Sequence, residues 1–266
     1  MPLEAKPETT FANLAPADLR AAIRAGRLRG QTAGLARDFV QANFVAMPRD
    51  WAEEFAEFCS LNQQACPLVA QTAPGDPTVP DLARDADLRY DIPAYRVYRD
   101  GRLDAELADI ASLWRDDLVC FLIGCSFTFD HYLLQAGVTV RHVEQGRNVS
   151  MYRTNRATSP TSRLSGPLVV SMRPVPARQV TLATETSARY PEVHGGPVYV
   201  GDPSELGIDD LARPDYGDAV DIYPGDVPMF WACGVTPQAV AIASRVPFMI
   251  THAPGCMFVT DRQLTT

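Results

Sequence analysis

The sequence predicts an α/β fold: a three-layer α/β domain with a largely parallel sheet, plus a smaller inserted α+β domain. Two observations lead to this prediction. Residues 118–123 form a short, unbroken apolar run, typical of a strand buried on both faces. This run ends in Gly-Cys-Ser before a helical stretch, and residues 228–244 repeat the order of strand, cysteine turn and helix. Such strand–turn–helix units favour a parallel sheet covered by helices.

The N-terminal third of the chain is predicted to be helical. A first amphipathic helix is expected to open at residues 15–18 and to run through Leu19 and Ile23, and Gly26 and Gly30 are expected to stop it. Residues 32–47 are expected to form a second helix. Pro48 suits the start of a third, whose aromatic residues 51, 55 and 58 share one face and are expected in the core.

The remaining elements divide the chain into two predicted domains. A strand at 95–98 is expected to enter an Asp-Gly turn. After the buried strand 118–123 and its helix, the sequence pattern changes. The segment that follows is predicted to contain strands at 138–144, 166–175 and 197–200 and a helix at 177–189. The prediction is therefore a main domain made of residues 1–137 and 226–266 and an inserted domain made of residues 138–225.

Charge and hydropathy exclude several classes of partner. The 266 residues include 24 basic and 32 acidic side chains, a formal net charge of −8, which argues against nucleic acid binding because phosphates need a basic face. The longest apolar run is about half of the ~20 residues that a membrane span requires. Because the first 30 residues show no apolar signal core, a cytoplasmic protein is expected. Self-association into a homo-oligomer is left open.

Residue counts also narrow the chemistry. The chain holds a single lysine, Lys6, so Schiff-base, pyridoxal phosphate and Walker-type phosphate chemistry are not expected. The six cysteines form no Cys-x-x-Cys pair and lie at no zinc-site spacing from the histidines, so we predict no metal and no cofactor, unless distant residues combine into a site. Of the four histidines, His131 and His142 are expected to be structural.

The two cysteine turns are predicted to carry catalytic groups. In open α/β sheets, ligands bind beyond the carboxyl ends of strands, where helix N–H groups attract anions. This places Cys125 and Ser126 in one turn and Cys233, Gly234 and Thr236 in the other, and we expect both turns at the carboxyl ends of parallel strands within one cleft. A thiol at a helix N-terminus has a lowered pKa, so Cys125 is a candidate nucleophile. Alternatively, the cysteines are small buried residues and the hydroxyls only cap helices.

Five further polar residues are candidates for the site. His194 and His252 lie in loops beside small residues and are predicted acid/base groups. Arg173 ends an apolar strand and needs an anion, which is either a substrate carboxylate or an internal Asp or Glu. Asn148 and Tyr152 are predicted to bind the substrate in a cleft between the domains.

Six strings, in this order, resemble the D-glutamate cyclase family: FLIGCSFTFD (121–130), RHVEQGRNVSMYRTN (141–155), GPLVVSMRPV (166–175), VHGGPVYVGDP (193–203), VPMFWACGVTPQAV (227–240) and ITHAPGCMFVTD (250–261). The resemblance implies a hydro-lyase with a three-layer α/β domain and a smaller α+β domain. Three departures stand out: Ser150 replaces an expected proline, residues 156–165 lack the family's Cys and Ala-Gly, and Cys256 replaces an expected histidine.

The resulting hypothesis is a lyase that removes water from a small amino or hydroxy carboxylic acid, most specifically by cyclising D-glutamate to 5-oxo-D-proline. His194 or His252 would take the amine proton, and N–H groups of the two turns would stabilise the oxyanion. Arg173 would hold the α-carboxylate, with Asn148 and Tyr152 completing the pocket. The alternatives are a hydro-lyase that acts on a hydroxy acid and a non-catalytic protein that binds small carboxylates.

Overall fold

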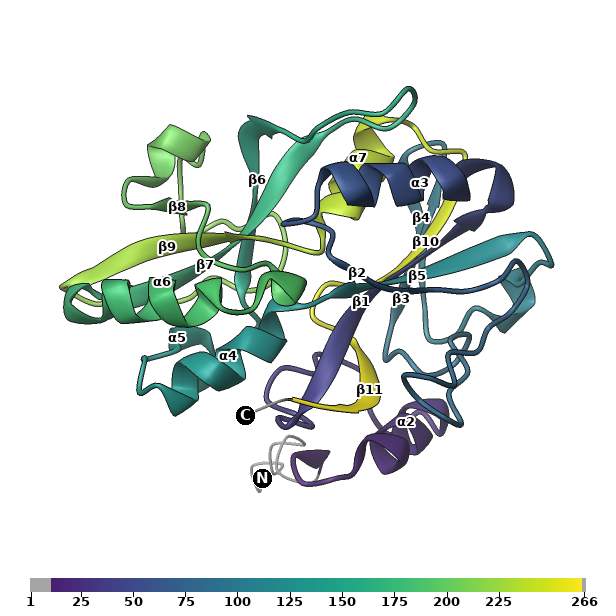
Figure 1. Cartoon of the computed structure of the whole chain (residues 1–266), viewed down its shortest axis with the longest axis horizontal. Coiled ribbons are helices and arrows are strands. Elements are labelled where there is room, and N and C mark those ends of the chain that lie inside the picture. The colour runs from purple at the N-terminus through teal and green to yellow at the C-terminus, as the bar shows by residue number, and fades with distance from the viewer. Residues whose placement is uncertain (1–10, 265–266) are drawn as a thin grey trace, which may run out of the picture.

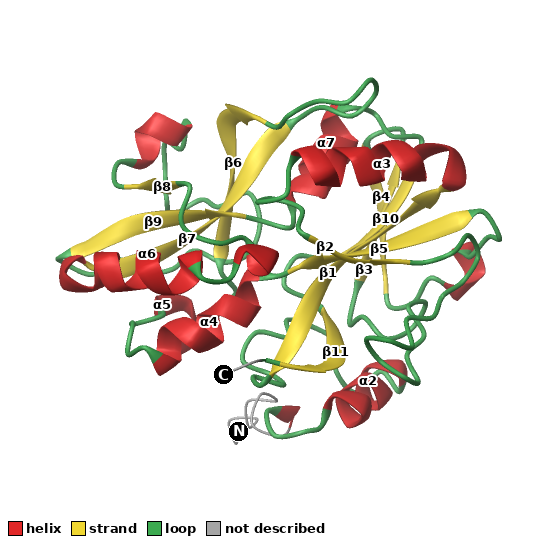
Figure 2. Ribbon diagram, viewed as in Figure 1, coloured by secondary structure: helices red, strands yellow, loops and turns green. Residues whose placement is uncertain are grey.

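The computed structural model describes residues 11–264 and shows a seven-stranded and a four-stranded sheet with helices packed against both (Figures 1 and 2). The larger sheet contains β1 (Phe39–Pro48), β2 (Leu68–Gln71), β3 (Tyr95–Arg99), β4 (Arg102–Leu107), β5 (Leu118–Gly124), β10 (Phe248–His252) and β11 (Phe258–Gln263). The smaller sheet contains β6 (Ser150–Ala157), β7 (Pro167–Pro176), β8 (Tyr199–Val200) and β9 (Asp226–Ala232). The helices are α2 (Pro16–Arg24), α3 (Arg49–Leu61), α4 (Ser126–Gln135), α5 (Arg141–Glu144), α6 (Val180–Ala188) and α7 (Thr236–Ala243).

The strand directions correct the predicted fold class. The structure is a mixed α/β protein, but every strand pair of the two sheets is antiparallel, so the prediction of a largely parallel sheet was wrong. The physical reason is the path of the two strand–turn–helix units. After β5, α4 leads to β6 in the other sheet, and after β9, α7 leads to β10 in the larger sheet. Parallel pairing requires a crossover that returns to the same sheet.

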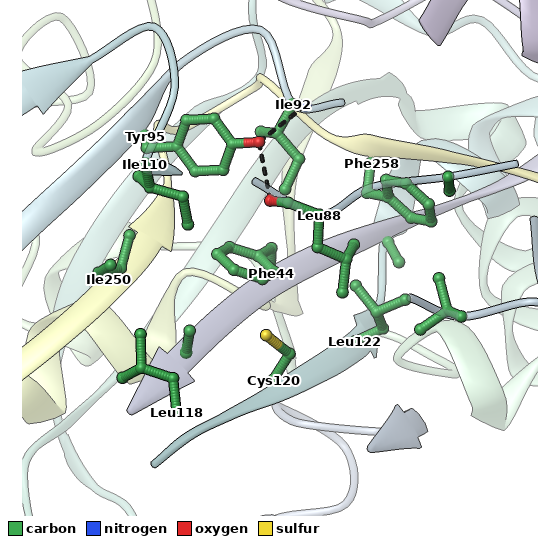
Figure 3. Packing of buried hydrophobic residues seen from close by; sticks show 14 of the residues in the cluster. Phe44, Leu88, Ile92, Tyr95, Ile110, Leu118, Cys120, Leu122, Ile250 and Phe258 are labelled. Atoms are coloured by element: carbon green, nitrogen blue, oxygen red, sulfur yellow. Dashed lines mark hydrogen bonds between the residues drawn. The ribbon is translucent and has the colours of Figure 1, made fainter. Parts of the chain in front are cut away.

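The buried run of β5 was correctly predicted to be covered on both faces. Cys120 and Leu122 point into one cluster, which also contains Phe44 and Tyr95, whereas Phe121 points into the cluster under α3 and α7. Figure 3 shows the first cluster, in which the Tyr95 hydroxyl accepts a hydrogen bond from the Ile92 amide and donates one to the Leu88 carbonyl. Two-sided burial in the middle of an antiparallel sheet therefore produces the same apolar run as a parallel strand.

Most predicted elements are present, and two are corrected. Helices α2 and α3 and strands β3, β5, β7 and β9 lie where the sequence places them, and β3 runs into the expected Asp-Gly turn. The predicted helix over 32–47 is wrong because this segment forms β1, which lies between β5 and β10 and also pairs with β11. The predicted strand over 138–144 is wrong as well, since the chain there turns into the short helix α5. At β1, pairing on both sides overrides local helical preference.

The division into domains 1–137 with 226–266 and 138–225 stays a prediction. The boundary at residue 226 coincides with the start of β9, which pairs with β7 and β8 in the smaller sheet. Helix α4 packs against α6, on the side of the smaller sheet (Figure 1). Within the described residues, no helix is both long enough and apolar enough to cross a membrane.

Candidate functional site

A buried arginine organises the candidate site. Arg173 extends from β7 toward α4 and is 0% exposed. Its Nε and Nη2 donate to the two carboxylate oxygens of Asp130 at 2.6 and 2.9 Å. Nη1 donates to Ser171 Oγ at 3.0 Å and Nη2 also donates to Ser126 Oγ at 3.1 Å. The guanidinium is thus paired with an internal carboxylate, the alternative left open by the sequence, and its role in binding a substrate carboxylate stays a prediction.

The carboxylate of Asp130 is held ionised by its neighbours. Burial alone would raise its pKa, but the charges of Arg173 and His142 lower the pKa of Asp130 to about 2. His142 Nε2 lies 3.3 Å from Asp130 Oδ2, within the distance of an ion pair. The contact does not have the geometry of a hydrogen bond. No sequence pattern singled out Asp130, and His142 was predicted to be structural. A usable signal was the spacing of Ser126 and Asp130, because residues i and i+4 share a helix face.

The first cysteine turn differs from its predicted chemistry. Cys125, not Ser126, is the N-cap of α4, and its Sγ accepts a hydrogen bond from the Phe127 amide at 3.4 Å. Burial raises the pKa of the Cys125 thiol well above its usual value, because desolvation outweighs the amide hydrogen bond. The expectation of a lowered thiol pKa at this helix end is therefore wrong. Ser126 is the first helical residue, and its hydroxyl faces Arg173.

The second cysteine turn meets the first through Asn43 of β1. Asn43 Nδ2 donates to the Gly124 carbonyl at 2.7 Å, and a Cβ on Gly234 would come within 2.0 Å of the same Nδ2. Only glycine permits this approach. The predicted neighbourhood of the two turns is therefore present, although their strands belong to different, antiparallel sheets. Burial raises the pKa of Cys233 to about 11, so this thiol is also neutral at pH 7.

Thr236 has a clear local role. Its hydroxyl donates to the Cys233 carbonyl at 2.6 Å and accepts from the Val169 amide at 3.2 Å, which ties the turn to β7. The N-cap of α7 is Val235, and Thr236 is the first helical residue. The hydroxyl is thus engaged by the backbone, and its predicted contact with a substrate stays a prediction.

His194 lies beside the first turn in an unusual conformation. Its backbone adopts φ +83°, a left-handed conformation that is costly for a residue with a Cβ and that concentrates at functional sites. The Nδ1 atom lies 2.8 Å from the Gln64 carbonyl, so Nδ1 carries the proton, and Nε2 is buried with no hydrogen-bond partner among the described residues. Burial and then the charge of Arg173 lower the pKa of His194 to about 4. At pH 7 it is a neutral imidazole with a lone pair on Nε2.

The loop of His194 is pressed against the first turn. A Cβ on Gly124 would lie 2.1 Å from the Glu192 carbonyl oxygen, so glycine is required where the two segments touch. Ser126 bonds to the buried Arg173, and Cys125, Cys233 and His194 lie near enough for the charge of Arg173 to lower their pKa values.

The other predicted site residues lie elsewhere in the fold. His252 Nδ1 is 3.1 Å from the Phe44 amide nitrogen, its Nε2 is buried without a described partner, and burial lowers its pKa to about 4. Asn148 Nδ2 donates to the Pro254 carbonyl at 3.2 Å. Tyr152 donates to the Leu211 carbonyl at 2.8 Å within a cluster that includes Met172. Since neighbouring strand residues face opposite ways, Tyr152 and Arg173 are separated by the smaller sheet.

Asn148 and Cys256 lie at the segment that follows β10. Burial raises the pKa of Cys256, which replaces the expected histidine, to about 12. A Cβ on Gly255 would come within 2.3 Å of Asn148 Nδ2, so Asn148 packs directly on this segment. Within residues 11–264, no three His, Cys, Asp or Glu side chains are grouped closely enough to hold a metal ion.

Comparison with known proteins identifies the class of this chain. Residues 119–261 match the D-glutamate cyclase family. Relatives named "Putative hydro-lyase" include a Cupriavidus taiwanensis protein, 59% identical over 92% of both chains, and a Rhodococcus opacus protein, 59% identical over 92% of this chain and 93% of its own. A Saccharopolyspora erythraea relative of the same name is 56% identical over 93% of this chain and 96% of its own. The chain belongs to the D-glutamate cyclase family.

Structural similarity is weaker. A solved structure of a nitrogen repressor-like protein from Methanococcus jannaschii covers 91% of this chain and 96% of its own, with a TM-score of 0.37 and 9% identity. A likeness of this size supports no statement about function.

Proposed function

We propose that this protein is a hydro-lyase that closes D-glutamate to 5-oxo-D-proline and releases water. The observation that carries the proposal is His194, a neutral buried imidazole whose Nε2 has no described partner and lies beside the Gly124–Ser126 turn. Membership of the D-glutamate cyclase family supports the choice of substrate.

The reaction requires two protons to move from nitrogen to oxygen. The ammonium nitrogen loses two protons and attacks the γ-carboxyl carbon, so that an N–C bond forms. One C–O bond then breaks, and the departing oxygen takes up the two protons and leaves as water. The site must therefore supply a base for the ammonium, donors for the oxyanion, and an acid for the leaving oxygen.

The residues around Arg173 meet two of these requirements directly. His194 Nε2 is the base in this proposal. Its lone pair is free at pH 7, and its pKa, which burial lowers to about 4, must rise when the negative charges of the substrate bind beside it. Ser126 Oγ already accepts a hydrogen bond from Arg173, so its own proton is free to be donated to the oxyanion. Arg173 is here a positioning residue, since four of its five N–H donors are occupied by Asp130, Ser171 and Ser126.

Isotope transfer tests the proposal. The protein is incubated with D-glutamate carrying ¹⁸O in both γ-carboxyl oxygens, and mass spectrometry follows 5-oxoproline. We expect product that retains one ¹⁸O, and at least about 10²-fold less of this product with His194→Gln. The control His131→Gln, which changes a partly buried histidine, should keep the rate within about twofold of wild type.

Other outcomes assign the alternatives. Turnover of a hydroxy acid but not of D-glutamate would show a different hydro-lyase. A rise in melting temperature with carboxylates but without turnover of any of them would show a binding protein.

A further inference from the structure

A hollow lies beside the Arg173 network, between the loop of residues 28–37 and helix α5. It measures about 300 Å³, and its walls include Arg29, Gln31, Arg37, His142, Val143 and Arg147. We call it the arginine-rimmed hollow. Gly34, Arg37 and His142 also line a smaller adjoining hollow of about 40 Å³, which Asp130 and Phe127 of α4 line as well. The hollow is thus joined to the buried network through His142 and Asp130.

The rim carries positive charge that the protein leaves largely unpaired. The exposed Arg37 bonds only to the Gly34 carbonyl through Nε, and the exposed Arg29 only to the Ala108 carbonyl, so neither has a carboxylate partner among residues 11–264. Arg147 Nη1 donates to the Ala219 carbonyl at 2.7 Å and to Asp221 Oδ1 at 2.9 Å. In a chain of net charge −8, a concave wall with three arginines and no acidic lining residue is an anion-attracting surface.

The floor of the hollow contains polar atoms without partners. His142 is 1% exposed, and its Nδ1 makes no hydrogen bond within the described chain. The side-chain oxygen of Gln31 is likewise buried and unpaired. Buried polar groups are nearly always hydrogen-bonded in folded proteins, so such a group at the floor of an open hollow points to a ligand.

We propose that the arginine-rimmed hollow binds a small anion with two negative charges, carried by carboxylate or phosphate groups. Guanidinium groups bind both kinds of oxyanion through paired N–H donors, and the volume suits a ligand of metabolite size. His142 contacts the anion from the floor, and Arg37 and Arg147 hold it from the rim. This binding does not depend on the proposed cyclisation.

Calorimetric titration tests the site with two probes, glutarate and inorganic phosphate, and the better ligand identifies the chemistry. We expect saturable binding that weakens with added sodium chloride, as charge pairing requires. The double variant Arg37→Gln/Arg147→Gln should raise the Kd at least about tenfold, whereas Arg178→Gln, an exposed arginine outside the hollow, should change it less than about twofold. Absence of binding by both probes, or equal loss in the control, overturns the proposal.

Ring-nitrogen NMR locates the ligand and separates this proposal from the cyclisation. With ¹⁵N-labelled histidine, the His142 signals should shift on titration, and His142→Gln should remove those signals and weaken binding. Shifts confined to His194 and His252 would place the ligand elsewhere and overturn the proposal. His194→Gln should leave the Kd of phosphate, which does not resemble the proposed substrate, unchanged whether or not it abolishes turnover, so failure of one proposal is not failure of the other.

Discussion

The chain buries two arginines within its described residues, Arg20 and Arg173, and the regions around them differ in what holds the charge. Arg20 lies on α2 and is 2% exposed. Its Nη1 donates to the Val259 carbonyl at 2.9 Å and to Asp261 at 2.8 Å. Asp261 is 40% exposed, so water still solvates this partner. The pair fastens α2 to β11, and the Arg84 amide also donates to Asp261.

Arg173 is enclosed on every side. Its partner Asp130 is only 6% exposed, and two serine hydroxyls accept hydrogen bonds from two further N–H groups. The ring centroids of Phe129 and Trp231 lie 4.5 and 5.4 Å from the guanidinium carbon. A buried charge pair gains little stability over apolar residues of the same shape, because desolvation offsets the attraction. We therefore expect Arg20 to serve the fold alone, and the network around Arg173 to act in the proposed reaction as well.

The largest expected effect follows from Arg173→Met. The substitution leaves Asp130 buried without its cation and should lower the free energy of unfolding by about 3–5 kcal/mol. The double variant Arg173→Met/Asp130→Leu should recover most of that stability and still show no turnover. Urea denaturation and steady-state kinetics on both variants measure this. Full activity in the double variant would show that the network only supports the fold.

Ser126→Ala tests the hydroxyl that faces Arg173. We expect kcat to fall about 10²-fold with a small change in KM, because the hydroxyl acts on an oxyanion that exists only during the reaction. Since Cys125 caps α4, the melting temperature should change little. The control Ser204→Ala, in an exposed turn, should leave kcat unaltered. Lower stability with an unchanged kcat would contradict this role.

The pH dependence of stability should distinguish the two regions. His194 has a folded pKa of about 4, below the ordinary value of 6.5, so it stabilises the fold above pH 6.5 and loses that contribution as the pH falls from 6.5 to 4. Unfolding free energies measured across this window should fall for wild type and fall less steeply for His194→Gln. Arg20→Met should keep the wild-type slope, since no histidine lies in its hydrogen-bond contacts. An equal slope in all three proteins would contradict the burial of a neutral His194.

Arg20→Met should cost less than Arg173→Met. The loss of charged hydrogen bonds to Val259 and Asp261 should lower the free energy of unfolding by about 1.5–3 kcal/mol, because the abandoned carboxylate is solvated. Turnover below the melting transition should equal that of wild type. A loss of activity without unfolding would mean that α2 contributes to the site after all.

Cys125→Ser should give the smallest effect. Serine is a good N-cap, and the thiol is neutral because burial raises its pKa, so kcat should stay within about threefold of wild type. Slow alkylation of Cys125 by iodoacetamide at pH 8, followed by peptide mass spectrometry, should agree. A fall of about 10²-fold would restore the nucleophile hypothesis.

The sequence alone predicts much of this architecture. Apolar periodicity, prolines and glycines located α2, α3, β5, β7 and β9 because these signals act over a few residues. The six strings identified the family, and their two cysteine turns do lie side by side at Asn43. Local chemistry thus defines the elements and points to the segments that contain the site.

Contacts between distant segments determined the strand directions, the ionisation of Cys125 and the partner of Arg173. Strand direction depended on whether a helix returned to its own sheet, which no local pattern encodes. The ionisation of Cys125 depended on desolvation by surrounding residues, which outweighed the field of the helix end. Arg173 needed an anion in any fold, but only packing of α4 on β7 brought Asp130, 43 residues away, within 2.6 Å of it. Burial and long-range pairing arise when the whole chain is assembled, so the physical state of the site emerges only at that level.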